Sequence, residues 1–128
     1  MTSKNVITFE ETMEWFVSTE HKGAIGLTVK FPIPEANVQA FIDFFTDYTP
    51  YVLEEDGCLQ FGFHQDWKNP NVFWLVESWA STSILLEHLG PNSRKGTKYE
   101  GETPLKIMAE LGAKPEPAAL YLVENTTK

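Results

Sequence analysis

The chain has 128 residues, of which 42% are hydrophobic and 13% aromatic, enough apolar material for the core of one domain. Its 10 basic and 18 acidic residues give a formal net charge of -8. We therefore exclude nucleic acid and membrane surfaces as partners, because phosphates and anionic lipids repel an acidic protein. No apolar run approaches the roughly 20 residues that cross a bilayer, and a single cysteine, Cys58, forms no intramolecular disulfide. We expect a cytoplasmic protein.

The first 22 residues are predicted to be an extension that precedes a domain spanning residues 23–128. Thr8 precedes Glu11 at the spacing of a capping box, and apolar residues then recur at helical intervals. These residues are Phe9, Met13, Phe16 and Val17. We expect a short amphipathic helix that packs on the domain surface or on a partner subunit.

The domain is predicted to begin with a strand and a long helix. Apolar residues alternate with small or polar ones from Gly23 to Phe31, as in a strand. The helix should start near Pro34 and carry one apolar stripe formed by Val38, Phe41, Ile42, Phe45, Tyr48 and Val52. Because Pro50 lacks an amide hydrogen, we expect a break or kink near Thr49.

A hairpin and a short helix follow. Strands over residues 58–66 and 71–79 are joined by a short polar connection containing Pro70, which is typical of a hairpin. The first of these strands is expected to carry Leu59, Phe61 and Phe63 on one face. Ser81 or Thr82 can cap the next helix, which should end at Gly90-Pro91. Residues 91–101 are polar and predicted to form a mobile loop.

A further helix is predicted from Thr103-Pro104 to Gly112, and a last strand over residues 118–124. The resulting β-α-β-β-α-β order is typical of a ferredoxin-like α+β domain, with an antiparallel sheet and helices on one face. The other face also carries large apolar side chains, including Trp74, Val76 and Tyr121. Because such a face favours association, we expect a homodimer in which two sheets pack together.

His88 is the best candidate for a catalytic base. It follows Ile84 and Leu85 by four and three residues, so it points with them from the helix towards the sheet. A hydrogen-bonded core histidine is an equal alternative. Glu77 needs a partner if it is buried in the third strand, and it either stabilises the fold or orients His88 as a supporting catalytic residue. His64 is the second candidate base, with a structural or surface role favoured.

Several other side chains are candidates for binding a substrate. Aromatic walls suit a planar ligand, although they are also ordinary core material. Arg94 lies in the polar loop and can attract an anionic substrate, although a solvated loop without a function is the favoured explanation. The candidate substrate-binding residues are Trp79, Phe61, Phe63, Tyr48 and Arg94. Since no two histidines have a local metal-ligand spacing, we predict no metal site.

The element order and several short segments resemble the antibiotic biosynthesis monooxygenase (ABM) domain. The segments are Glu55-Asp56-Gly57-Cys58-Leu59, Asn69-Pro70-Asn71 and Val76-Glu77-Ser78-Trp79, with His88 nine residues later. This resemblance covers about residues 23–124 and implies a dimeric α+β barrel. It also implies ligand binding between the helices and the sheet.

The resemblance leaves several activities to compare. Haem-degrading relatives use an asparagine and a tryptophan where this chain has Leu27 and His88, and aromatic polyketide cyclases use a tyrosine and a histidine near Leu85 and Pro91. Both branches are disfavoured. We therefore expect a monooxygenase of the quinone-forming type that needs no cofactor and acts on a small aromatic or enolisable metabolite. A non-catalytic small-molecule-binding or structural dimer, and an oxygen-independent isomerase or cyclase, stay open as alternatives.

Overall fold

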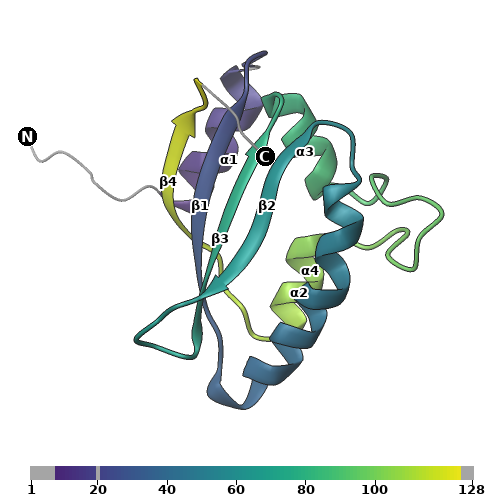
Figure 1. Ribbon diagram of the computed structural model, residues 1–128. Helices are drawn as coiled ribbons and strands as arrows, with labels where there is room; N and C mark the ends of the chain where they lie inside the picture. The colour runs from purple at the N-terminus through teal and green to yellow at the C-terminus, as the bar shows by residue number, and fades with distance from the viewer. Residues whose placement is uncertain (1–7, 20, 125–128) are drawn as a thin grey trace, which may run out of the picture.

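The computed structural model describes residues 8–19 and 21–124, and it has the predicted α+β ferredoxin-like architecture. Four strands form one antiparallel sheet in the order β2-β3-β1-β4: β1 (Ile25–Pro32), β2 (Cys58–Gln65), β3 (Val72–Trp79) and β4 (Glu116–Leu122). The helices are α1 (Phe9–Thr19), α2 (Val38–Leu53), α3 (Thr82–Leu89) and α4 (Pro104–Glu110), with a 3-10 turn, η1 (Glu35–Asn37), before α2. Figure 1 shows the helices gathered on one side of the curved sheet.

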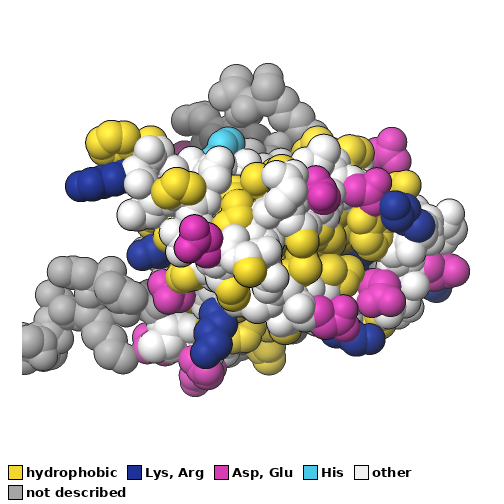
Figure 2. All heavy atoms as spheres, turned by 90° about the horizontal axis from the view of Figure 1, so that it is seen from below, with side chains coloured by type: hydrophobic (Ala, Val, Ile, Leu, Met, Phe, Trp, Pro, Cys, Tyr) yellow, Lys and Arg dark blue, Asp and Glu magenta, His cyan; other side chains and the backbone are white. Residues whose placement is uncertain are grey.

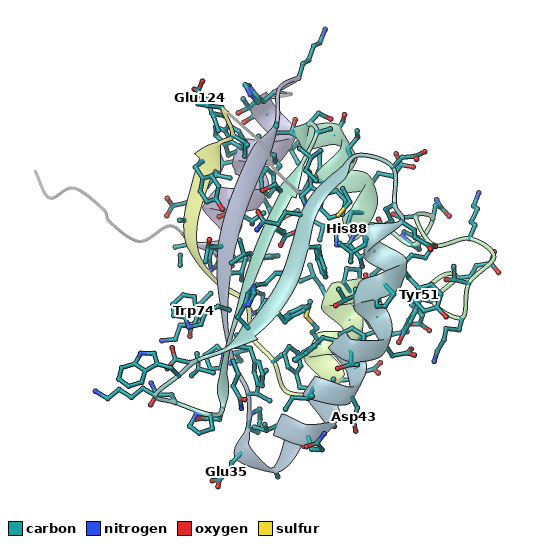
Figure 3. All side chains as sticks on the ribbon, in the orientation of Figure 1. Glu35, Asp43, Tyr51, Trp74, His88 and Glu124 are labelled. Carbon is teal, nitrogen blue, oxygen red and sulfur yellow. The ribbon has the colours of Figure 1, made fainter. Side chains whose placement is uncertain are left out.

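The strand register separates the two faces of the sheet. Leu27 in β1 lies opposite Glu77 in β3, which in turn lies opposite Phe61 in β2. These three side chains therefore share the face that the helices cover, together with most of the buried core. Residues of the alternate register, such as Val76 and Trp74, lie on the other face, and Trp74 points away from the helices in Figure 3.

Helix α2 continues through Pro50 to Leu53, so the predicted break near Thr49 is absent. The apolar stripe explains this continuity, because Tyr48 and Val52 on either side of Pro50 are both buried in the core. Packing of that face against β2 outweighs the loss of one helical hydrogen bond at the proline. The predicted stripe itself is confirmed.

The ends of two elements differ from the sequence-based expectation. Strand β4 begins at Glu116, two residues earlier than predicted, and includes Pro117 opposite Val29. A proline is tolerated there because β4 is an edge strand that pairs only with β1. In β2 an irregularity between Cys58 and Gln60 brings Cys58 opposite Trp79, so Cys58 is the buried member of that segment.

Helix α1 packs on the domain through one side, against α3 and β4, as predicted for a helix on the domain surface. Thr8 caps it as predicted, because its side-chain oxygen accepts a hydrogen bond from the Glu11 amide at 3.0 Å. Phe16 is only 2% exposed and belongs to the main core. The connection after α1 is attached to α3, where the amide and hydroxyl of Thr82 both donate to the carbonyl of His21, at 3.1 and 3.2 Å.

Candidate active site

An internal cavity lies between the sheet and the helices. Its volume is about 50 Å³ and its wall is mostly apolar. The sheet contributes Leu27, Val29, Phe61, Phe63, Leu75 and Glu77, and the helices contribute Phe9, Thr12, Met13, Phe16, Tyr48, Leu85, His88, Leu105 and Met108, among others. Four of these residues belong to α1, so the N-terminal helix forms one wall of the cavity. The wall has few polar side chains, and three of them, Tyr48, Glu77 and His88, can exchange protons or form hydrogen bonds with a ligand.

His88, on α3, is 3% exposed and lies in the cavity wall. Its ring packs against Trp79 in a tilted arrangement with ring centroids 4.4 Å apart, and it meets Phe61 edge to face with centroids 5.6 Å apart. In Figure 3 His88 lies between α3, the C-terminal end of α2 and the sheet. These contacts fix the plane of the imidazole, as the function of a base requires.

Glu55 fixes the tautomer of His88. The Glu55 carboxylate oxygens lie 3.0 and 3.1 Å from His88 Nδ1. A carboxylate only accepts hydrogen bonds, so Nδ1 carries the hydrogen and donates it, and Nε2 of the neutral ring keeps its lone pair. Among the described residues, none hydrogen-bonds to Nε2. The imidazole therefore keeps Nε2 as its basic nitrogen, because the hydrogen bond between Glu55 and Nδ1 sets the tautomer from the opposite side of the ring.

Arg94 holds Glu55 in turn. It is 2% exposed, and its Nη1 lies 3.2 Å from Glu55 Oε2. The same guanidinium donates to the carbonyls of His88, Gly90 and Glu102 at 2.9 to 3.1 Å. Arg94 therefore ties the loop 91–101 to the end of α3, and this part of the predicted mobile, solvated loop is anchored in the interior.

Glu77 lies in the middle of β3 and is 5% exposed. The predicted hydrogen bond to His88 is absent; Oε1 instead accepts one from Trp79 Nε1 at 2.8 Å. Burial raises the pKa of the Glu77 carboxyl, and this outweighs the lowering by nearby His88 and by the Trp79 hydrogen bond. A neutral carboxylic acid at this position can donate a hydrogen bond into the cavity.

Tyr48, on α2, is 1% exposed, and its hydroxyl has no hydrogen-bond partner among the described residues. Burial also raises its pKa strongly, so the phenol stays protonated. A buried hydroxyl without a partner costs about 1–3 kcal/mol. The hydroxyl of Tyr48, in the cavity wall, is therefore available to a polar group of a bound ligand.

The other candidate site residues fall in three places. Phe61 and Phe63 line the cavity. Trp79 lies directly behind His88 and is fully buried. His64 is exposed and lies opposite Trp74 in the register, on the sheet face without helices. The substrate-binding role of Arg94 remains a prediction, and its described contacts are all with the protein.

Sequence reasoning missed Glu55 as the partner of His88. The two residues are 33 positions apart, and no periodicity links the turn after α2 to the last turn of α3. The one available signal was that Glu55 lies directly before the Asp56-Gly57 turn, close to the start of β2, where a carboxylate can reach the neighbouring elements. Within residues 8–19 and 21–124, no three histidine, cysteine or acidic side chains form a group that could hold a metal ion.

The raised pKa of Glu77 has a consequence for stability. The folded state keeps the proton at pH values where the unfolded chain loses it, so the stabilisation from Glu77 falls as pH rises from about 4.3, the ordinary carboxyl pKa, to the raised pKa. We expect Glu77→Gln, which stays neutral, to gain stability relative to wild type across that range. Urea unfolding of both proteins at pH 4 and pH 8 measures this, and a difference independent of pH would contradict it.

Fold and cavity together define a ferredoxin-like α+β protein with a buried histidine–glutamate pair beside an apolar cavity. The model of the antibiotic biosynthesis monooxygenase family matches residues 24–95, more than half of the chain. The chain therefore belongs to this family. The match begins after α1 and ends before α4 and β4. No curated protein matches the chain.

Solved structures support the same fold. A Bacteroides thetaiotaomicron protein of unknown function, for which oxidoreductase activity is suggested, is 20% identical and has a TM-score of 0.62 over 80% of this chain and 99% of its own. A Deinococcus radiodurans protein provisionally assigned as an antibiotic biosynthesis monooxygenase is 15% identical, with a TM-score of 0.62 over 82% and 96%. A Caulobacter crescentus protein with the same assignment is 20% identical, with a TM-score of 0.58 over 84% and 94%. At these identities the likeness shows the fold alone.

Proposed function

We propose that the protein is a cofactor-independent monooxygenase that oxidises a small aromatic or enolisable metabolite in the cavity, with His88 as the base. One observation carries this proposal. Glu55 hydrogen-bonds to Nδ1 of His88, so Nε2 is left as the nitrogen that can accept a proton. A buried imidazole with a fixed tautomer, beside an apolar cavity, is suited to removing a weakly acidic proton from a phenol or from carbon next to a carbonyl.

The chemistry balances without a metal or flavin, since the substrate supplies the electrons. For an anthrone-type substrate, His88 Nε2 removes a proton from the methylene group, and the resulting carbanion transfers electrons to dioxygen. A carbon–oxygen bond forms, giving a hydroperoxide. Loss of the second methylene proton and cleavage of the oxygen–oxygen bond then leave a ketone and one water. One oxygen atom of dioxygen enters the product and the other becomes water.

The neighbouring groups have distinct roles in this proposal. Tyr48 donates a hydrogen bond to the oxygen on which negative charge develops, and the carboxyl of Glu77, whose pKa is raised by burial, donates a second one in its protonated form. Glu55 stabilises the imidazolium after His88 has taken the proton. It also lines a second, more polar cleft of about 210 Å³, together with Asp56, Glu87 and His88, which gives the proton a route towards solvent.

The proposal is tested by oxygen consumption. The purified protein, treated with a chelator and free of flavin, should consume one dioxygen per anthrone and yield the corresponding quinone, with one atom from labelled dioxygen in the product. Enolisation or ring closure of a carbonyl substrate under anaerobic conditions, without oxygen consumption, would instead support an isomerase or cyclase. Binding without turnover under either condition would support the non-catalytic alternative.

We also propose that the protein acts as a homodimer in the cytoplasm. Helices cover one face of the sheet, whereas the other face carries Trp74, Val76 and Tyr121, and Tyr121 is 38% exposed. Packing this face against its copy buries these side chains. The single cysteine, Cys58, forms no intramolecular disulfide, which suits a reducing compartment.

The dimer is tested by a charge on its proposed interface. Val76→Glu places like charges against each other in the two copies, so we expect the mass in solution, measured by light scattering, to halve. Val17→Glu makes the same substitution at a solvent-exposed position of α1, on the helix-covered side of the sheet, and is the matched control. A wild-type mass equal to one chain would contradict the proposal.

A further inference from the structure

Helix α1 forms one wall of the cavity, and residues from Phe9 to Phe16 along the helix line it. Thr12 and Phe16 are 3% and 2% exposed, and Phe9 and Met13 lie partly buried on the same side of the helix. All four line the cavity. The opposite side of α1 faces solvent, where Val17 is 65% exposed. The helix therefore presents a continuous apolar wall to the cavity, although it precedes the family match.

The cavity is smaller than an aromatic ligand needs. Its volume is about 50 Å³, whereas an apolar cavity that holds benzene has about 150 Å³. Strands β1, β2 and β3 form the opposite wall, and their hydrogen-bonded register resists displacement. Side chains on α1 are the part of the wall that can change position at least cost, because α1 packs against the edge strand β4 and is not itself part of the hydrogen-bonded sheet.

An open groove of about 360 Å³ adjoins the cavity at this turn. Phe9, Leu105 and Pro115 line both the groove and the cavity. Phe9 of α1 and Leu105 of α4 therefore lie where the groove adjoins the cavity, and Met13 lines the cavity one helical turn further along α1. The other end of α1 is attached through the two hydrogen bonds from Thr82 to the carbonyl of His21. Adjustment at the Phe9 end therefore leaves the helix attached.

We propose that Phe9 and Met13 determine the size of the planar ligand that the cavity admits, and thus the substrate range of the enzyme. The choice of aromatic ligands rests on the proposed function, whereas the size limit is a property of the wall. Met13 is the stronger determinant, because it lies one helical turn deeper than Phe9 and packs against the core.

The test compares ligands of two sizes in four proteins. Binding of phenol and anthrone is measured by calorimetry without oxygen, so that turnover does not interfere. Met13→Ala should strengthen anthrone binding roughly tenfold or more and change phenol binding much less, since removing side-chain atoms from an apolar pocket changes discrimination by that order. Met13→Trp should weaken anthrone binding. Val17→Ala, on the exposed side of α1, is the matched control and should bind as wild type.

The outcomes separate this inference from the proposed function. Equal anthrone affinity in wild type, Met13→Ala and Met13→Trp would overturn the size limit even if wild type oxidises anthrone. Size-dependent binding without oxygen consumption would support the wall and contradict the monooxygenase. Circular dichroism verifies that each variant is folded. Met13→Trp, which fills the cavity, and Met13→Ala, which enlarges it, test the size limit in opposite directions.

Discussion

Replacing His88 by Gln is expected to lower the rate of anthrone oxidation by about 10²–10⁴-fold, the usual contribution of a general base. Gln can still donate a hydrogen bond to Glu55, so the network behind the ring survives in part, but it has no basic nitrogen facing the cavity. Anthrone affinity should change little, because the aromatic wall and the Tyr48 hydroxyl remain. The measurement is kcat from oxygen consumption, with the affinity determined separately in the absence of oxygen.

His64→Gln is the matched control for this prediction. It makes the same chemical change at an exposed histidine on the other face of the sheet, and it should leave the rate unchanged. Loss of turnover in His64→Gln with full activity in His88→Gln would move the base to His64 and refute the proposed site. Both variants should elute like wild type in gel filtration, which shows that assembly is unaffected.

Much of the fold follows from local patterns. Alternation marks β1, and the apolar stripe of α2 and the Ser81 cap of α3 mark the two helices; the Ser81 hydroxyl accepts from the Ile84 amide at 3.3 Å. These patterns are set by residues close in sequence. Where the prediction failed, at Pro50 and at the start of β4, the deciding interactions come from distant residues: core packing in one case and the edge position of β4 in the other.

The site was less predictable than the fold. His88 could be placed on the inner side of its helix, because Ile84 and Leu85 define that side. The hydrogen-bond partner of His88 could not be identified from the sequence. Glu55 and Glu77 both lie within reach of α3 in this topology, and only the three-dimensional arrangement distinguishes them. The orphaned hydroxyl of Tyr48 is likewise a property of its surroundings. The role of α1 as a cavity wall depends on how it packs against α3 and β4, which the sequence does not determine locally.

Arg94→Met should destabilise the protein by about 3–5 kcal/mol, the usual cost of removing one partner of a buried ion pair. The Glu55 carboxylate loses its cation, and three backbone carbonyls lose their donor. Met keeps the apolar stem of the side chain out to about the position of Nε, so much of the packing around the stem is preserved. Urea unfolding monitored by tryptophan fluorescence measures the change.

Two further variants show whether charge burial causes that loss. Lys95→Met removes a neighbouring exposed cation and should stay within about 0.5 kcal/mol of wild type. The double variant Glu55→Met with Arg94→Met removes both charges, so it should be more stable than Arg94→Met alone, because no carboxylate is left buried without its cation. If Arg94→Met costs less than about 1 kcal/mol, or if the double variant is the less stable of the two, burial of the unpaired carboxylate is not the cause.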